Sequence, residues 1–160
     1  MLIRAALPQD RSAVWQILEP VIRAGETYTL DRNLTQADAL AYWFSEDKLT
    51  FVAEQDGAIL GTYYLRANQS GGGNHVCNCG FMTAEAASGR GIARQMCLHA
   101  FSQAQAEGYR AMQFNFVVST NERAIGLWQS LGFEVVGRLP LAFQHPRLGE
   151  VDALVMFRRL

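Results

Sequence analysis

The N-terminal part of the chain has apolar residues at helical spacing. Five of them recur along one helix face: Val14, Ile17, Leu18, Val21 and Ile22. This spacing predicts a helix over 8–23, with a kink at Pro20 and an end at Gly25. Thr35 and Asp38 have the spacing of a capping box, so a second helix is expected to begin at Thr35.

From residue 49 onward the pattern changes to runs of β-branched and aromatic residues. Asp56-Gly57 separates two such runs and predicts a tight hairpin. Strands are expected over 2–7, 49–55, 58–65, 75–82, 111–118, 133–139 and 151–158, and two further helices over 91–107 and 121–131. The order β-α-α-β-β-β-α-β-α-β-β predicts an α/β (α+β) fold, a mixed, mostly antiparallel sheet flanked by helices in one domain, 1–160. The stretch 139–151 is expected to be irregular and apolar.

Composition excludes several classes of protein. The net charge is -1 and no basic stripe is present, which argues against a nucleic-acid partner. No apolar run approaches the roughly 18 residues of a membrane span, and the N-terminus lacks the features of a signal peptide. Three cysteines, an odd and low number, indicate free thiols in a reducing compartment, so a cytoplasmic location is expected.

The segment Ser88-Gly89-Arg90-Gly91-Ile92-Ala93 lies between a predicted strand and a predicted helix. Glycines there let the backbone approach a ligand, and the first-turn N–H groups of the helix favour an anion such as a pyrophosphate. The segment lacks the Gly-Lys-Ser/Thr of a Walker loop, and a dinucleotide fingerprint would need a small residue in place of Arg94. A helix start that merely requires small residues is the alternative interpretation.

Three segments together resemble the GCN5-related N-acetyltransferase (GNAT) superfamily. They are 81–83, 88–93 and the stretch 121–133, Asn-Glu-Arg-Ala-Ile-Gly-Leu-Trp-Gln-Ser-Leu-Gly-Phe. The resemblance implies that the co-substrate is acetyl-CoA, and no metal is expected. The residues it assigns to acetyl-CoA are Phe81 and Thr83 for the pantetheine, Ser88, Gly89, Arg90, Gly91, Ile92 and Ala93 for the pyrophosphate, and Asn121 and Trp128 for the cofactor arm.

A narrower resemblance concerns the acceptor. The segments 61–68, 75–81 and Phe114-Asn115 are similar to the yeast branch of the superfamily that acetylates proline analogues such as azetidine-2-carboxylate. That resemblance implies that Asn78 and Asn115 bind the substrate and serve catalysis. The segment containing Glu26, Thr27 and Tyr28 resembles the acceptor loop of phosphinothricin-type acetyltransferases. The alternative is that both strand amides are simply satisfied by neighbouring backbone.

Two positions depart from the superfamily pattern. Ser88 stands where Arg or Gln is usual, so the expected contact there is with the backbone. Trp128 stands where Tyr is frequent, and an indole cannot act as a general acid at neutral pH. His75, Cys77 and Cys79 alternate onto one face but lack zinc spacing, so small buried thiols are expected. Glu54 and Glu85 are expected to be surface groups without partners.

These patterns predict an acetyl-CoA-dependent N-acetyltransferase for a small amine, an amino acid or proline analogue, with a role in detoxification. A water held by Asn78 or Asn115 is expected to take the acceptor proton, because no carboxylate or imidazole is evident as a base. Two alternatives stay open: a non-catalytic acetyl-CoA sensor, and a protein lysine or N-terminal acetyltransferase. The resemblance also implies a homodimer formed through the C-terminal strands.

Overall fold

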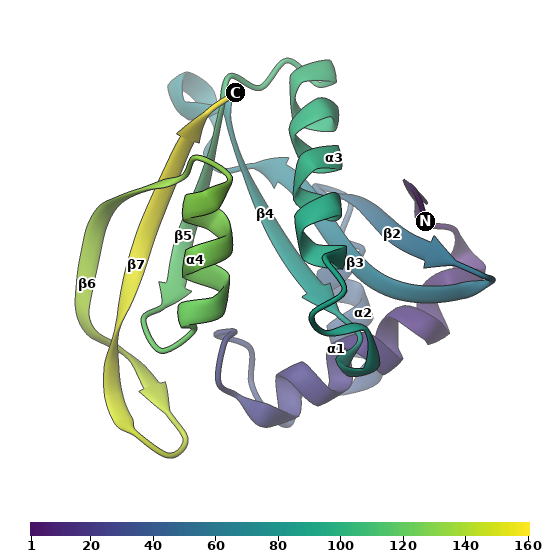
Figure 1. Ribbon diagram of the computed structural model, residues 1–160, viewed down its shortest axis with the longest axis horizontal. Coiled ribbons are helices and arrows are strands. Elements are labelled where there is room, and N and C mark those ends of the chain that lie inside the picture. The colour runs from purple at the N-terminus through teal and green to yellow at the C-terminus, as the bar shows by residue number, and fades with distance from the viewer.

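The computed structural model describes residues 1–160, and its frame is one seven-stranded sheet in the order β1-β2-β3-β4-β5-β7-β6 (Figure 1). The strands are β1 Leu2–Ala5, β2 Leu49–Gln55, β3 Ala58–Ala67, β4 Val76–Thr83, β5 Ala111–Val118, β6 Glu134–His145 and β7 Gly149–Arg159. Only β4 and β5 are parallel neighbours; every other pair is antiparallel. The predicted mixed, mostly antiparallel fold is therefore confirmed.

Helices cover both faces of the sheet (Figure 1). They are α1 Arg11–Ala24, α2 Gln36–Trp43, α3 Ile92–Ala106 and α4 Glu122–Ser130, with short 3-10 turns η1 Pro8–Asp10, η2 Gly71–Gly73 and η3 Glu85–Ala87. The apolar residues of α1 and α2 pack on one face against β2, β3 and β4. Those of α3 and α4 pack on the other face, in a larger cluster that reaches β7. Two separate hydrophobic cores therefore lie on opposite faces of one sheet.

Local signals in the sequence form the expected caps and turns. Thr35 caps α2 by accepting a hydrogen bond from the backbone N–H of Asp38, and Gly25 ends α1 at φ 65°. Asp56 and Gly57 both have positive φ, 52° and 77°, as a type I′ hairpin requires. Pro20 lies inside α1 without ending it.

The C-terminal hairpin corrects the expectation of an irregular segment at 139–151. β6 runs on to His145 and β7 starts at Gly149, with a register shift between Leu139 and Phe143. β6 is an edge strand, and most of its residues are exposed. An exposed strand has no need to alternate apolar and polar residues, and Pro is tolerated at an edge, so the sequence carried no clear strand signal here.

Glu54 also corrects an expectation, because it has a partner. Arg4 contacts the Glu54 carboxylate at 2.7 Å and the Asp10 carboxylate at 2.7 Å, which ties β1 to β2 and to η1. The hydrogen bond from Arg4 lowers the pKa of Asp10, a buried carboxyl that also accepts from the backbone N–H of Leu7. Glu85, in contrast, is exposed, as expected.

Candidate active site

The site begins where β4 and β5 separate. These strands pair only at Val76↔Ala111 and Cys77↔Met112, and they diverge beyond that point (Figure 1). β5 is further irregular between Phe114 and Val117, where its register against β7 shifts. Two neighbouring parallel strands therefore enclose a wedge of space that no strand fills.

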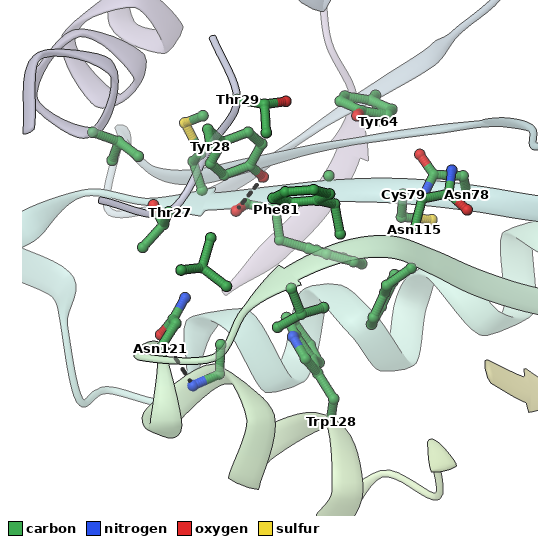
Figure 2. A pocket seen from close by; sticks show the side chains of 18 of the residues that line it. Thr27, Tyr28, Thr29, Tyr64, Asn78, Cys79, Phe81, Asn115, Asn121 and Trp128 are labelled. Atoms are coloured by element: carbon green, nitrogen blue, oxygen red, sulfur yellow. Dashed lines mark hydrogen bonds between the residues drawn. The ribbon is translucent and has the colours of Figure 1, made fainter. Parts of the chain in front are cut away.

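A cavity of about 400 Å³ occupies this wedge. Its lining comes from α1 and the loop after it, from α2, from β3, β4 and β5, and from α4 with the residues before it (Figure 2). Backbone groups of β4 also face it. Asn68 N–H donates to Val76 O and Ala84 N–H to Leu60 O, so even-numbered residues of β4 bond to β3. Odd-numbered residues such as Phe81 then direct their backbone groups toward the wedge.

The cavity passes through the sheet, because side chains of a strand alternate between its faces. Asn78 and Met82 of β4 belong to the face covered by α1 and α2, with Tyr64 of β3 beside them. Phe81 packs on the opposite side, toward α3 and α4. Figure 2 shows Tyr28, Thr29 and Tyr64 on one side of the strands and Trp128 and Asn121 on the other. We call these the α1/α2 side and the α3/α4 side of the cavity.

Aromatic residues form much of the wall on the α1/α2 side. The Tyr28 hydroxyl donates to the backbone O of Phe81 at 2.9 Å, and burial raises the pKa of Tyr28 well above its usual range (Figure 2). Tyr64 lies over Gly80, where an added Cβ would stand 2.6 Å from the ring. Only glycine therefore fits beneath this ring. Tyr42 meets Tyr64 edge-on with 3.3 Å between their hydroxyls.

Side-chain amides cluster at the point where the strands part. Asn78 Nδ2 donates to the backbone O of Gln113 at 2.9 Å, and its Oδ1 has no partner within the chain. Asn115 accepts from Gln113 Nε2 at 2.9 Å and donates to Asn68 Oδ1 at 2.6 Å. The structure thus brings Asn78 and Asn115 to one cavity. Only Asn78 makes the backbone contact that the alternative interpretation requires, and only through Nδ2, whereas Asn115 contacts other side chains.

The α3/α4 side is predominantly aromatic. Trp128 is buried against Phe81 and Phe114, with ring centroids 5.3 and 5.1 Å away, and its indole N–H has no partner within the chain. Asn121 begins α4 by accepting from the backbone N–H of Ala124 at 3.3 Å (Figure 2). The cavity is lined by Asn121, Trp128, Thr83 and Phe81. These are four of the ten residues predicted to bind the cofactor.

The predicted phosphate loop lies outside the cavity lining, at the N-terminus of α3. Gly89 and Gly91 have φ of 81° and 75°, which side chains rarely adopt, and no side chain caps the helix. The first-turn N–H groups of α3 are thus left for a ligand. Three arginines surround the loop: Arg90, Arg94 and Arg123, which contact Gln55, Ser130 and Ser88.

The acceptor loop is only partly at the cavity. Thr27 and Tyr28 line it, but Glu26 does not. The Glu26 carboxylate instead pairs with Arg147 of the β6–β7 turn at 2.7 Å. Sequence reasoning assigned no role to Tyr64, Arg66 and Gly80, which line the cavity, or to Gln113, which contacts both asparagines. The glycine in the middle of β4 was a signal for the close approach of Tyr64, because such a glycine often marks one, but it did not point to Arg66 or Gln113.

No carboxylate or imidazole lines the cavity, and Arg66 is its one charged residue. Burial raises the pKa of Cys79, which lines the cavity, well above its usual range, so this thiol stays protonated. All three cysteines are buried and free, as expected. No cluster of three or more His, Cys, Asp or Glu side chains is placed to hold a metal ion. None of the helices combines the length and apolar character of a membrane span.

Comparison with known proteins places this geometry in a family. Residues 13–133 match the model of the Acetyltransferase (GNAT) family, and the chain belongs to that family. A GCN5-related N-acetyltransferase from Kribbella flavida has 42% identity and a TM-score of 0.94, over 99% of this chain and 97% of that one. A phosphinothricin acetyltransferase from Sinorhizobium meliloti, solved in complex with AcCoA, shares the fold with a TM-score of 0.86 and 20% identity, over 99% of this chain and 88% of that one.

A relative in Schizosaccharomyces pombe is the N-acetyltransferase aca1. It is 27% identical over 132 residues, which make up 72% of this chain and 63% of that protein. This chain thus spans less than two thirds of the relative's length.

Proposed function

We propose that this chain is an acetyl-CoA-dependent N-acetyltransferase that acts on the amine of a small molecule, an amino acid or proline analogue. The observation that carries the proposal is a cavity through the split between β4 and β5, next to the uncapped N-terminus of α3. An anionic thioester and a polar amine need different surroundings, and the two sides of the cavity provide them. The family membership supports the same reaction class.

The residues at the α3 terminus fit the pyrophosphate of CoA. The space around a Cβ at Gly91 is open, so no other part of the chain covers the loop at this residue. The N–H groups of Ile92 and Ala93 lie in the first turn, where the helix dipole favours an anion. Arg90 and Arg94 add positive charge beside them. The backbone of Phe81 and Thr83 would hold the pantetheine arm in the wedge, and Asn121 and Trp128 would flank it.

Acetyl-CoA supplies an activated acetyl group, and the chain positions the acceptor. The free Oδ1 of Asn78 is available to accept an N–H from the acceptor amine. Asn115, held by Gln113 and Asn68, can orient a water beside it. A backbone N–H of β4 that faces the wedge can stabilise negative charge on the reacting carbonyl.

Proton movement relies on water. No side chain that lines the cavity is suited to act as a general base at neutral pH. The pKa values of the Tyr28 and Tyr64 phenols are raised by burial. Trp128 cannot protonate the leaving thiolate. A thiol with a pKa near 8.5 is, however, an acceptable leaving group without general-acid catalysis. We therefore assign positioning roles to Asn78 and Asn115 and packing to Trp128.

The cavity favours a small acceptor over a peptide. The loop carrying Thr27 and Tyr28 covers the α1/α2 side, and the Glu26–Arg147 ion pair joins this loop to the β6–β7 hairpin. An extended peptide would have to displace these contacts. Small acceptors suit a detoxifying role, and the three free thiols suit a cytoplasmic location.

A homodimer through the C-terminal hairpin is part of the proposal. β6 pairs with β7 on one side only, and its outer edge is free; it carries exposed apolar residues, among them Val135, Val136, Leu139 and Leu141. Such an edge is a template for pairing with another chain. Light scattering at working concentration should give twice the 17.8 kDa chain mass. A monomer mass would contradict the pairing.

The function is tested by a thiol-release screen. Acetyl-CoA is incubated with the purified chain and a panel of amino acids, cyclic analogues, their amides and a lysine-containing peptide. We expect CoA release with free amino acids or cyclic analogues above the peptide. Tight acetyl-CoA binding without turnover of any amine would instead identify a sensor, and turnover of the peptide alone would identify a protein acetyltransferase.

A further inference from the structure

We propose that Arg66 recognises a carboxylate on the acceptor, so that the preferred acceptors carry an acid group next to the amine. This inference rests on the proposed acetyltransferase function and adds a residue that sets its specificity. Arg66 lies on β3 and is the one charged residue among the 21 that line the cavity. A ligand with a compensating negative charge is the simplest partner for it.

The guanidinium of Arg66 is only partly used by the protein. Its Nη1 donates to Asp47 Oδ2 at 3.1 Å, and Asp47 is 56% exposed, so this ion pair is weak. Arg66 Nε is buried and is the one buried side-chain nitrogen or oxygen in the chain without a hydrogen-bond partner. Burying an unpaired donor is unfavourable, and such a group in a native structure calls for an explanation. The edge formed by Nε and Nη2 has the fork geometry that binds a carboxylate with two hydrogen bonds.

The position of Arg66 matches the size of an amino acid. Arg66 is directly opposite Asn78 in the β3–β4 ladder, so both side chains lie on the α1/α2 side. Directly opposed residues have Cβ atoms about 4.5–5.5 Å apart. In an α-amino acid the carboxylate and the amine are attached to one carbon. A carboxylate on Arg66 therefore leaves the amine near the free Oδ1 of Asn78.

The charges around this position also favour an anion. Lys48 Nζ lies 3.6 Å from the Tyr42 ring centroid and 4.9 Å from that of Tyr64, the two rings that flank this part of the cavity. Asp47 is the carboxylate that faces Arg66 and Lys48, which leaves two cations against one anion. This balance attracts an acceptor with a carboxylate and disfavours one that carries only an ammonium group.

The test compares acids with amides of the same amine. The probes are L-proline, L-azetidine-2-carboxylate and L-methionine, each with its amide, and kcat/KM is measured by CoA release. We expect the wild type to prefer the acids. In Arg66→Gln, kcat/KM for the acids should fall on the order of 30- to 100-fold, mainly through KM, because a charge-assisted contact is lost. For the amides it should change less than about threefold, so the preference disappears.

Two variants and one control separate specificity from folding. Arg66→Lys keeps the charge but not the fork, and should retain part of the acid preference. Arg138→Gln removes an arginine that pairs with Asp152 at 2.7 Å outside the cavity, and should leave the preference unchanged. Should Arg66→Gln fail to fold, Arg66→Lys and the wild-type acid-to-amide ratio still decide the question. A wild type that acetylates amides as well as acids overturns the Arg66 assignment alone, whereas one that acetylates no amine overturns the proposed function with it.

Discussion

The two sides of the cavity are lined by different kinds of side chain. The α3/α4 side is formed by packed aromatic rings, Trp128 against Phe81 and Phe114. The α1/α2 side carries amides, phenols and Arg66. The first side offers backbone and apolar surface, which suit a co-substrate shared by a whole family. The second offers directional polar side chains, which suit the selection of an acceptor.

This contrast teaches how one sheet can serve two ligands. A strand places successive side chains on opposite faces, so a single split between β4 and β5 opens toward both cores. Changes on one side should then alter one ligand and spare the other. The substitutions below test that independence, from the largest expected effect to the smallest.

The largest effect is expected from Gly91→Glu. The substitution introduces a side chain at φ 75° and a negative charge where a phosphate would lie, so acetyl-CoA binding should be abolished in calorimetry. Gly149→Glu is the matched control, because Gly149, the first residue of β7, has φ 74° and equally open surroundings. It should carry a similar conformational cost, roughly 1–2 kcal/mol, without loss of binding. Unchanged affinity in Gly91→Glu would refute the loop assignment.

Next in size are the two strand amides. Asn78→Ala and Asn115→Ala should each lower kcat/KM by on the order of 10², with acetyl-CoA affinity nearly intact. Asn78 also ties β4 to Gln113 at 2.9 Å, so its variant should lower the unfolding temperature more than Asn115→Ala does. Asn33→Ala, at an exposed amide, is the control for a surface change. Near-full turnover in both cavity variants would remove their assigned roles.

A smaller effect, confined to the α1/α2 side, is expected from Gly80→Ala. The new methyl would stand 2.6 Å from the buried Tyr64 ring, which must shift. Overpacking of this kind costs about 1–3 kcal/mol of stability. The acceptor KM should rise while acetyl-CoA affinity stays unchanged. Gly72→Ala, with open space around it, should leave both constants at wild-type values. Loss of acetyl-CoA binding in Gly80→Ala would show that the two sides are not independent.

The smallest effect is expected from Trp128→Phe. Phenylalanine keeps an aromatic ring against Phe81 and Phe114 and loses one indole N–H that has no partner in the chain. Turnover should fall only a few-fold, and stability by less than about 1.5 kcal/mol. Steady-state kinetics and thermal unfolding measure both. A variant without activity would mean that the indole N–H takes part in the reaction after all.

The sequence by itself determined the local elements and the glycine-rich turn before α3. Helical spacing in α1, the Thr35 cap and the Asp56-Gly57 turn depend on residues close in the chain, so their signals are readable without a partner. The glycines at the N-terminus of α3 are also a local signal of this kind. The glycine loop alone is a common motif, but together with the stretch 121–133 it resembles the GNAT superfamily.

Only the tertiary structure decided how the α1/α2 side of the cavity is assembled. Arg66 and Asn78 are twelve residues apart and meet because β3 and β4 pair in one register, and Asn68 meets Asn115 across the split. Glu26 contacts the distant Arg147 instead of the cavity, and Glu54 contacts Arg4. Beyond Leu139, β6 carried no clear strand signal because it lies at an exposed edge. Contacts between distant residues depend on register, strand divergence and burial, which arise only when the whole sheet is formed.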